Sequence, residues 1–245
     1  RIGNATLHQR ALIGSASLAG NTISWQLETD GGSDALLFLP EKLYTAGLPK
    51  AKSLVSRPLI RFSGEFNVNG QTRNIDGWLG SENHNWGSKH TDQYAWGQVA
   101  GFAERPDAFL ECATARVKLG PFSSPWLTIV CLRLGEETLS FNRIGTALKA
   151  QGEYEFFDWR FRTHADGNTL SARIQAPKHH FTALTYYNPP GGSKTCLNSK
   201  IACCDLELTR ADGSRLSLHS PHGAAFEILT DRPDHGVPLA VPGSF

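Results

Sequence analysis

The sequence predicts an all-β protein built from antiparallel strands, and three observations support this fold class. Short segments that alternate between apolar and polar residues recur along the 245 residues, and they are rich in β-branched and aromatic side chains. Asn-Gly, Asp-Gly and Pro-containing turns separate these segments. Segments with helical periodicity are scarce. Many short strands separated by turns are typical of a sandwich or a barrel.

The first predicted element is a helical turn or two near Leu39 to Gly47, after Pro40. Two strands then flank the Asn69-Gly70 turn. The clearest alternation follows over 94–102, 108–117, 126–134, 169–176, 181–188 and 204–218. Hydrophobic residues make up 40% of the chain and charged residues 19%, so a packed core is expected and disorder is not.

An internal similarity indicates a duplication. The segment "IGSASLAGNTISWQLET", which starts at Ile13, resembles "IGTALKAQGEYEFFDWRFRT", which starts at Ile144. Trp25 and Trp159 align after a short insertion. A repeat of this length indicates a duplicated domain, whereas a solenoid unit would be shorter. Chance similarity between two strands is the alternative.

The duplication predicts two domains, 1–134 and 135–245, with a boundary near Leu134 to Asn142. The two halves differ in their chemistry. "GWLGSENHNWG" in the first half corresponds to "LSLHSPHGAAFE" in the second, which lacks the Glu-x-His-x-Trp group. We therefore assign the special chemistry to the first domain and no catalytic pattern to "PHGAAFE".

Composition excludes several classes of partner. The net charge of +1 provides no basic surface for nucleic acid. No apolar segment approaches the ~18 residues of a membrane span, and "NPPGGSK" lacks the spacing of a phosphate-binding loop. No signal-peptide pattern is present at the N-terminus, so we expect a cytoplasmic monomer or homodimer. Because the chain begins at Arg1 and not at methionine, a removed leader stays open.

The five cysteines favour free thiols over a disulfide framework, which is typical of shorter secreted chains. Cys112 and Cys131 lie on successive predicted strands. A bridge from Cys196 to Cys203 or Cys204 is the alternative, because a hairpin could bring these residues together.

The segment "GSENHNWGSKHTDQYAWGQ", Gly80 to Gln98, concentrates ionisable, amide and aromatic side chains. In a strand, residues two apart point to the same face. This periodicity places the members of three sets on common faces, with a register break allowed at Gly80. The sets are Trp78, Glu82, His84 and Trp86; then Tyr94, Trp96 and Gln98; and then Phe109 and Glu111.

These faces predict an aromatic pocket for a large apolar ligand with one point of polar chemistry. A carboxyl group in such a pocket has its pKa raised by desolvation and can donate a proton near neutral pH. Aromatic rings stabilise a developing cation. We therefore expect Glu82 or Glu111, acting with His84, to protonate an alkene, with Asn85 or Gln98 available to hold a water molecule.

Two alternatives to this pocket stay open. The tryptophans could simply fill a core, with the polar groups bonded to one another. A metal site made of Glu82, His84, His90 and Asp92 is the second, although its spacing matches no standard ligand pattern. We expect neither a metal nor a nucleotide cofactor.

At His84-Asn85-Trp86-Gly87, followed by "YAWGQ", the chain resembles the carotenoid 1,2-hydratases, or hydroxyneurosporene synthases. The wider relatives of that family include lipocalin-like bacterial proteins and fungal cyclases that form decalin rings. The resemblance implies two tandem lipocalin-like antiparallel β-barrels. It also implies that His84 and Trp86 take part in protonating a terminal alkene, with Glu111 in place of the downstream acid.

The chain departs from that pattern before the histidine, where Ser81-Glu82-Asn83 replaces Tyr-His-Asp. This difference leaves Glu82 as an alternative acid and slightly favours cyclisation or isomerisation over hydration. We predict a cofactor-independent cyclase, isomerase or hydratase that acts on a hydrophobic, unsaturated terpenoid or polyketide-like compound. Catalysis is expected from Glu82, His84, Trp86 and Glu111, and substrate binding from Trp78, Asn85, Tyr94, Trp96, Gln98 and Phe109. A carrier of a lipophilic molecule is the second interpretation, and a domain with a filled barrel is the third.

Overall fold

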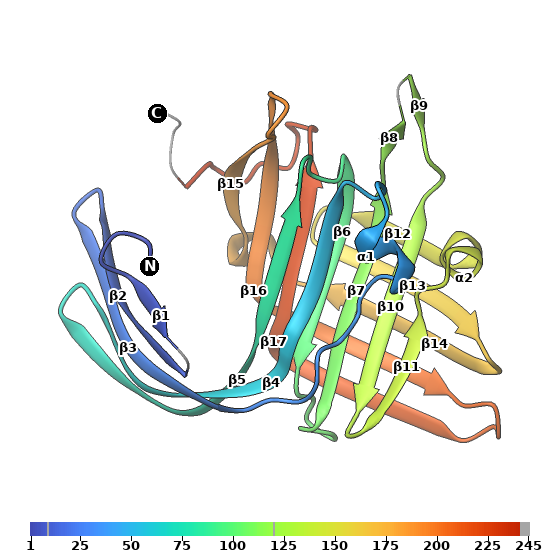
Figure 1. Ribbon diagram of the computed structural model, residues 1–245, viewed down its shortest axis with the longest axis horizontal. Helices are drawn as coiled ribbons and strands as arrows, with labels where there is room; N and C mark the ends of the chain where they lie inside the picture. The colour runs from blue at the N-terminus through green and yellow to red at the C-terminus, as the bar shows by residue number, and fades with distance from the viewer. Residues whose placement is uncertain (9, 120, 241–245) are drawn as a thin grey trace. The chain divides into compact units, whose positions relative to one another are not determined.

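The computed structural model describes residues 1–8, 10–119 and 121–240 (Figure 1). The all-β fold class is confirmed, because antiparallel sheets make up most of these residues. The chain divides into two compact units. The first comprises Arg1–Leu36 with Val55–Asn83, and the second comprises Leu37–Leu54 with the chain from His84 onward.

The first unit is built on a five-stranded sheet in the order β1-β2-β3-β4-β5. Its strands are β1 (Thr6–His8), β2 (Ala11–Leu18), β3 (Asn21–Gly31), β4 (Ala51–Val68) and β5 (Gln71–Gly87). The predicted Asn69-Gly70 turn joins β4 to β5. Its φ angles of 51° and 84° are those of the tight turn that Asn-Gly favours between antiparallel strands. Residues 51–54 and 84–87, at the ends of these two long strands, belong to the second unit.

The second unit is built on a ten-stranded sheet whose path runs β11-β10-β7-β6-β17-β16-β14-β13-β12, with β15 paired to β16. Its strands are β6 (Gln93–Ala100), β7 (Ala108–Arg116), β10 (Leu127–Leu134), β11 (Glu137–Phe141), β12 (Gln151–Glu155), β13 (Asp158–Ala165), β14 (Asn168–Gln175), β15 (Thr182–Tyr187), β16 (Ser193–Thr209) and β17 (Arg215–Thr230). A small hairpin of β8 (Lys118–Leu119) and β9 (Phe122–Ser123) stands apart from this sheet.

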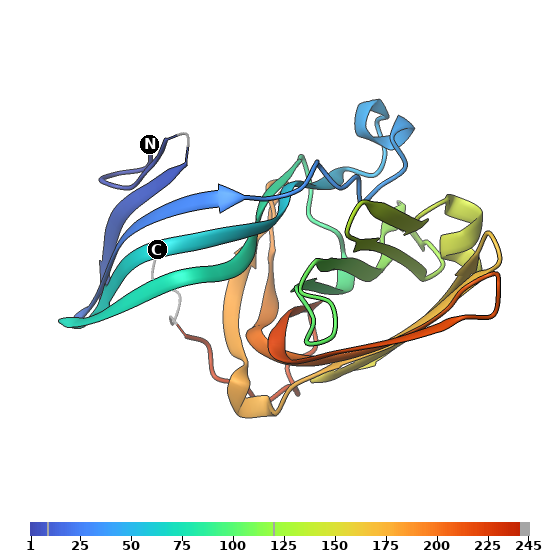
Figure 2. The ribbon, with the colours of Figure 1, turned by 90° about the horizontal axis from the view of Figure 1, so that it is seen from below.

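The ten-stranded sheet is strongly curved, so that β13 faces β7 across one core (Figure 2). Trp159 on β13 is fully buried, and its Nε1 donates a hydrogen bond of 3.0 Å to Thr114 Oγ1 on β7. Gly97 on β6 faces this core, opposite Ile174 and Trp159. A Cβ there would come within 2.5 Å of Ile174 Cδ1, so glycine allows β6 to lie close to the opposite wall.

Short helices complete the second unit. The predicted helical turn after Pro40 is confirmed as α1 (Lys42–Thr45). α2 (Ile144–Lys149) and a 3-10 turn (Lys178–His180) follow later in the chain. Ile13 lies in β2, whereas Ile144 begins α2, so the two copies of the proposed repeat differ at this point. Ala147, Leu148 and Lys149 favour a helix more than the serines that follow Ile13.

Residue 134 ends β10, in the hairpin that joins β10 to β11 within the ten-stranded sheet. The units described above have other bounds, and the division into 1–134 and 135–245 stays a prediction. Within the described part of the chain, no helix is long and apolar enough to cross a membrane.

All five cysteines are free, as favoured from the sequence. Cys196 pairs with Leu229 and Cys204 pairs with Ser220, at separate positions along the single strand β16. An extended strand rises about 3.3 Å per residue, which holds the Cys196 thiol far from the other two on this strand. The bridge from Cys196 to Cys203 or Cys204 is therefore not formed.

Candidate functional site

Two of the predicted site residues lie in the first unit: Glu82 is partly exposed and Trp78 is exposed. The Glu82 carboxylate is 3.5 Å from Arg57 Nη1, and 44% of its side chain is accessible to solvent. Ser56 Oγ donates to the Glu82 backbone carbonyl. Trp78 is 56% exposed and contacts the edge of Phe66. Glu82 is therefore an ion-paired surface carboxylate in its own unit.

His84, Asn85 and Trp86 lie at the exposed end of β5, in the second unit. The His84 ring stacks on Trp86 with centroids 5.0 Å apart, and Trp86 stacks on Tyr44 at 5.8 Å. Tyr44 lies within α1 and is held at its hydroxyl. Leu39 N donates to Tyr44 Oη, which donates in turn to Ser53 O. The histidine and tryptophan of the sequence motif thus form an aromatic stack that ends on Tyr44.

Glu111 is the most deeply buried of the predicted acids, at 1% exposure. It lies on β7 directly opposite Gln98 on β6. Gln98 Nε2 donates to Glu111 Oε2 at 2.7 Å, and Trp96 Nε1 donates to Glu111 Oε1 at 2.8 Å. Burial raises the pKa of Glu111 from 4.5 to about 7, and these two hydrogen bonds lower it by less. The carboxyl group is therefore held in place and partly protonated at neutral pH.

A segment of the second unit, residues 37–54, covers the sheet face that carries Glu111. Cys131 is the partner of Glu111 on β10, and its Sγ lies 3.6 Å from Leu37 O. Asn142 Nδ2 donates to Leu37 O and Phe38 O at 3.3 and 3.2 Å. Burial raises the pKa of Tyr44, and Cys131 and Glu111 add smaller contributions in the same direction. Tyr44 therefore lies close enough for the charge on Glu111 to affect the pKa of its hydroxyl. We call residues 37–54 the cover segment.

The two faces of the sheet around Glu111 carry different side chains: one faces the apolar core, and the other carries Glu111. Leu110 and Cys112, its neighbours on β7, point into the apolar core. Phe109 is fully buried on the same face as Glu111. The alternation expected for Phe109 and Glu111 is therefore confirmed by the strand register, which pairs Phe109 with Ala100 and Glu111 with Gln98.

Glu227 is a second carboxylate on this face, and sequence reasoning missed it. Glu227 on β17 pairs directly with Trp96 on β6. Lys200 Nζ is 3.1 Å from Glu227 Oε1 and 5.4 Å from the centroid of the Trp96 ring. The side-chain amide of Asn198 donates to the same carboxylate. Trp96 is thus flanked by Glu111 on one side and by the Glu227–Lys200 pair on the other.

The alternation of Phe226 and Ile228 with Glu227 in "AAFEILT" places the acid on the face opposite the core, which is the one signal that the sequence offered. Recognising its partner requires knowing that β17 pairs with β6, and this contact links residues far apart in the chain. Tyr44 could not be assigned for the same reason.

Tyr94, another predicted binding residue, lies further along the same face. Burial raises its pKa well above the ordinary value, with smaller contributions from Cys196 and Glu227. Tyr94 pairs with Leu229 on β17, which pairs with Cys196 on β16. Tyr94, Trp96 and Gln98 thus project from alternate positions of β6 towards one face, as the alternation predicted.

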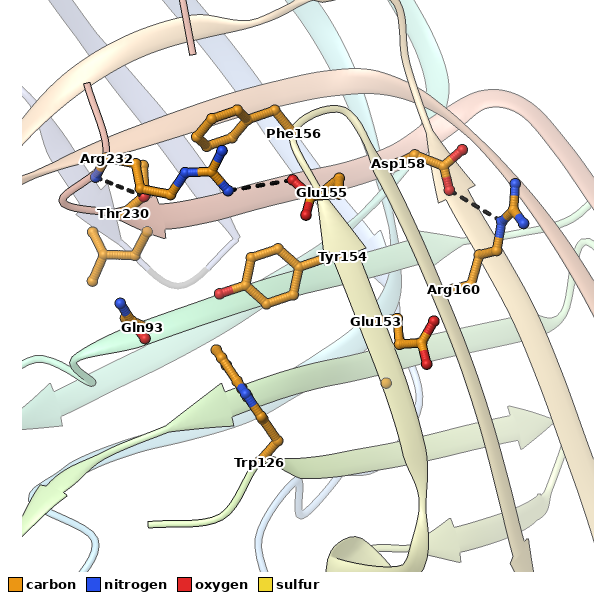
Figure 3. A pocket seen from close by; sticks show the side chains of 12 residues that line it. Gln93, Trp126, Glu153, Tyr154, Glu155, Phe156, Asp158, Arg160, Thr230 and Arg232 are labelled. Atoms are coloured by element: carbon orange, nitrogen blue, oxygen red, sulfur yellow. Dashed lines mark hydrogen bonds and ion pairs between the residues drawn. The ribbon is translucent and has the colours of Figure 1, made fainter. Parts of the chain in front are cut away.

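A separate cavity of about 660 Å³ opens near the ends of β6, β12 and β17 (Figure 3). The rings of Trp126 and Tyr154 meet edge to face at 5.6 Å, and Arg232 pairs with Glu155. None of the residues predicted for the site lines this cavity. Its lining consists of Gln93, Trp126, Gly152, Glu153, Tyr154, Glu155, Phe156, Asp158, Arg160, Leu229, Thr230 and Arg232.

The alternative metal site is not assembled among the described residues. Asp92 accepts hydrogen bonds from Lys89 Nζ at 2.9 Å and Lys118 N at 2.7 Å. His90 packs against the Tyr186 ring. Across the described residues, the one group of three possible metal ligands is Cys203, Asp205 and His219.

No known protein-family profile matches the chain. An uncharacterized protein of Mycobacterium tuberculosis, found in strains H37Rv and CDC 1551, is 23% identical over 195 residues. The match covers 79% of this chain and 58% of the mycobacterial protein, so the chain spans less than two thirds of that relative.

Two solved structures have a similar fold. Kievitone hydratase from Nectria haematococca superposes with a TM-score of 0.53 at 11% identity, over 91% of this chain and 65% of the hydratase. A candidate AttH from Nitrosomonas europaea superposes with a TM-score of 0.50 at 12% identity, over 93% and 70% of the two chains. At the level of fold, these structures agree with the resemblance to hydratases that the sequence motif indicated.

Proposed function

We propose that this chain is a hydratase that adds water to an alkene of an apolar small molecule, or removes it in reverse, by acid–base catalysis. The observation that carries the proposal is the buried carboxyl group of Glu111, which has its pKa raised to about 7 and both oxygens held by Trp96 and Gln98. The fold shared with a kievitone hydratase is a supporting observation.

Glu111 is proposed as the proton donor. A general acid works best when its pKa lies near the working pH, because it is then both protonated and willing to release the proton. Glu111 meets this condition through burial beneath the cover segment, without a basic side chain among its hydrogen-bond partners. In the proposed step, the Glu111 O–H bond breaks, the proton is transferred to one alkene carbon, and the other carbon becomes cationic.

Trp96 is proposed to stabilise this cation. Its ring already lies 5.4 Å from the Lys200 ammonium, a distance at which aromatic rings attract cations. The stack of Trp86 on Tyr44 offers a second aromatic surface within the same unit. His84, stacked on Trp86, is then a positioning residue in this proposal.

Glu227 is proposed to activate the water. Lys200 and Asn198 hold the carboxylate from two sides, which fixes its orientation. Water attacks the cationic carbon, a C–O bond forms, and Glu227 takes the released proton. The product is an alcohol, and a proton passes through solvent from Glu227 to Glu111 to restore the starting state. Cyclisation or isomerisation would begin with the same protonation and differ only in the fate of the cation.

The test uses the 245-residue chain with kievitone and a panel of apolar terpenoid and polyketide-like alkenes in ¹⁸O-labelled water. Hydration predicts a product heavier by one labelled water, and Glu111→Gln should slow its formation by ~10²–10⁴-fold while binding is retained. A product of unchanged mass that takes up deuterium from D₂O would replace hydration with isomerisation or cyclisation. Tight binding without any product, in the wild type and the variant alike, would contradict the enzyme and favour a carrier.

A further inference from the structure

A second group of chemically active side chains lies on β16 and β17, outside the site described above. Cys203 and Asp205 are two residues apart on β16, so both point to the same face of the sheet. His219 on β17 is the direct cross-strand partner of Asp205. Side chains directly opposite one another on antiparallel strands have Cβ atoms about 5 Å apart, within reach of a shared ligand.

The side chains of these three residues converge. His219 Nδ1 lies 2.7 Å from Asp205 Oδ1, and Cys203 Sγ lies 3.9 Å from Asp205 Oδ2. One ligand atom from each residue lies within 4.8 Å of the other two. A tetrahedral zinc ion with bonds of about 2.3 Å to sulfur and about 2.0 Å to nitrogen holds those two atoms about 3.5 Å apart. Small side-chain rotations would therefore close the site.

We propose that Cys203, Asp205 and His219 bind Zn²⁺ through three protein ligands and leave the fourth position to solvent. Thiolate, imidazole and carboxylate are the three ligand types that zinc takes in proteins. Sites with three protein ligands keep a position open for water or a substrate atom. The face of the site is accessible, because Cys203 and His219 are half-buried and Asp205 is exposed.

The charged side chains near Cys203, Asp205 and His219 do not oppose the binding of a cation. Arg173 pairs with Asp205 across β14 and β16, but its guanidinium is held by the carboxylate of Asp158. On the other side, the Glu104 carboxylate accepts a hydrogen bond of 2.7 Å from His219 N. Glu104 and Asp158 therefore offset Arg173. When Zn²⁺ binds, Cys203 releases its thiol proton, and metal bonds replace the contact between His219 and Asp205.

The first test titrates the tag-free 245-residue chain with Co²⁺, a spectroscopic substitute for Zn²⁺. A charge-transfer band from thiolate to Co²⁺ is expected, and an equal concentration of Zn²⁺ should remove it. Cys203→Ser should eliminate the band. His219→Ala should weaken Zn²⁺ binding by ~100-fold or more, since even outer partners of metal ligands contribute 10- to 100-fold. His222→Ala, on the same strand, is the matched control and should bind as the wild type does.

The second test measures the alkylation rate of the Cys203 thiol with and without Zn²⁺. Because the wild type serves as its own reference, a folding defect in a variant cannot be mistaken for loss of the metal site. Cys203 is the one cysteine of the five that is not buried. Iodoacetamide should therefore alkylate it first in the native chain, and Zn²⁺ should slow that reaction in the wild type but not in His219→Ala. Equal alkylation rates with and without Zn²⁺, or Zn²⁺ affinity unchanged by His219→Ala, would overturn the proposal.

Discussion

Glu82 and Glu111 are the two carboxyl groups that the sequence offered as acids, and their environments differ. Glu82 shares its surroundings with Arg57 and solvent. Glu111 lies beneath the cover segment, with amide and indole N–H groups as its hydrogen-bond partners. Burial raises the pKa of Glu111 to about 7, and the hydrogen bonds and the Lys200 charge offset only part of this rise. A carboxyl group close to a sequence motif is thus a weaker candidate than one that the fold desolvates.

The largest expected effect is a difference in kcat between variants of these two acids. Glu111→Gln should lower kcat by ~10²–10⁴-fold, the usual contribution of a general acid. Glu82→Gln should retain activity within a few-fold, because its carboxylate is exposed and ion-paired. The measurement is the initial rate of product formation with substrate binding checked by tryptophan fluorescence. If Glu82→Gln lost the activity and Glu111→Gln retained it, the assignment of the acid would be reversed.

The second effect concerns Glu227, which distinguishes water addition from a reaction that needs only a proton donor. Glu227→Gln should reduce hydration by ~10²-fold, at the lower end of the range for a general base. Lys200→Met, which removes the ion-pair partner, should reduce it by less. Product analysis gives the sharper result: side products without added water should increase in Glu227→Gln. Unchanged rate and products would remove Glu227 from the mechanism.

The third effect is on stability and depends on pH. Between pH 4.5 and about 7, folded Glu111 keeps a proton that the unfolded chain has released, so stability falls as pH rises through this window. The difference of about 2.5 pKa units corresponds to about 3 kcal/mol. Urea denaturation at pH 4.5 and pH 8 should show this loss in the wild type and a loss smaller by about 3 kcal/mol in Glu111→Gln. Equal pH dependence in both proteins would mean that Glu111 is not desolvated.

The smallest expected effect compares two tryptophans. Trp78→Ala should change the free energy of unfolding by only about 0.5 kcal/mol, because its side chain is largely exposed. Trp96→Phe keeps a smaller aromatic ring but removes the N–H that bonds Glu111. This bond lowers the pKa of Glu111, so its loss should shift the upper limb of the pH–rate profile to higher pH. A shift in the Trp78 variant instead would show that the site extends over Trp78.

Local pattern was sufficient for the fold class and for part of the site. Alternation placed Trp96 and Gln98 on one face, and the register places Gln98 opposite Glu111. The Asn69-Gly70 turn followed from its dipeptide alone. The cover segment and Glu227 could not be predicted, because each meets the site through contacts between residues far apart in the chain. Periodicity identifies which residues share a face but not what covers that face.

The hydrogen bonds from Asn142 to the cover segment have a thermodynamic consequence. Closing the segment over Glu111 and binding a proton to Glu111 favour each other, since the burial that closure provides is what raises the pKa. An opening that exposed Glu111 to solvent would therefore release part of a proton at neutral pH, and its free-energy cost would fall as pH rises from 4.5 to about 7. Closure of the cover segment and protonation of Glu111 are therefore thermodynamically linked.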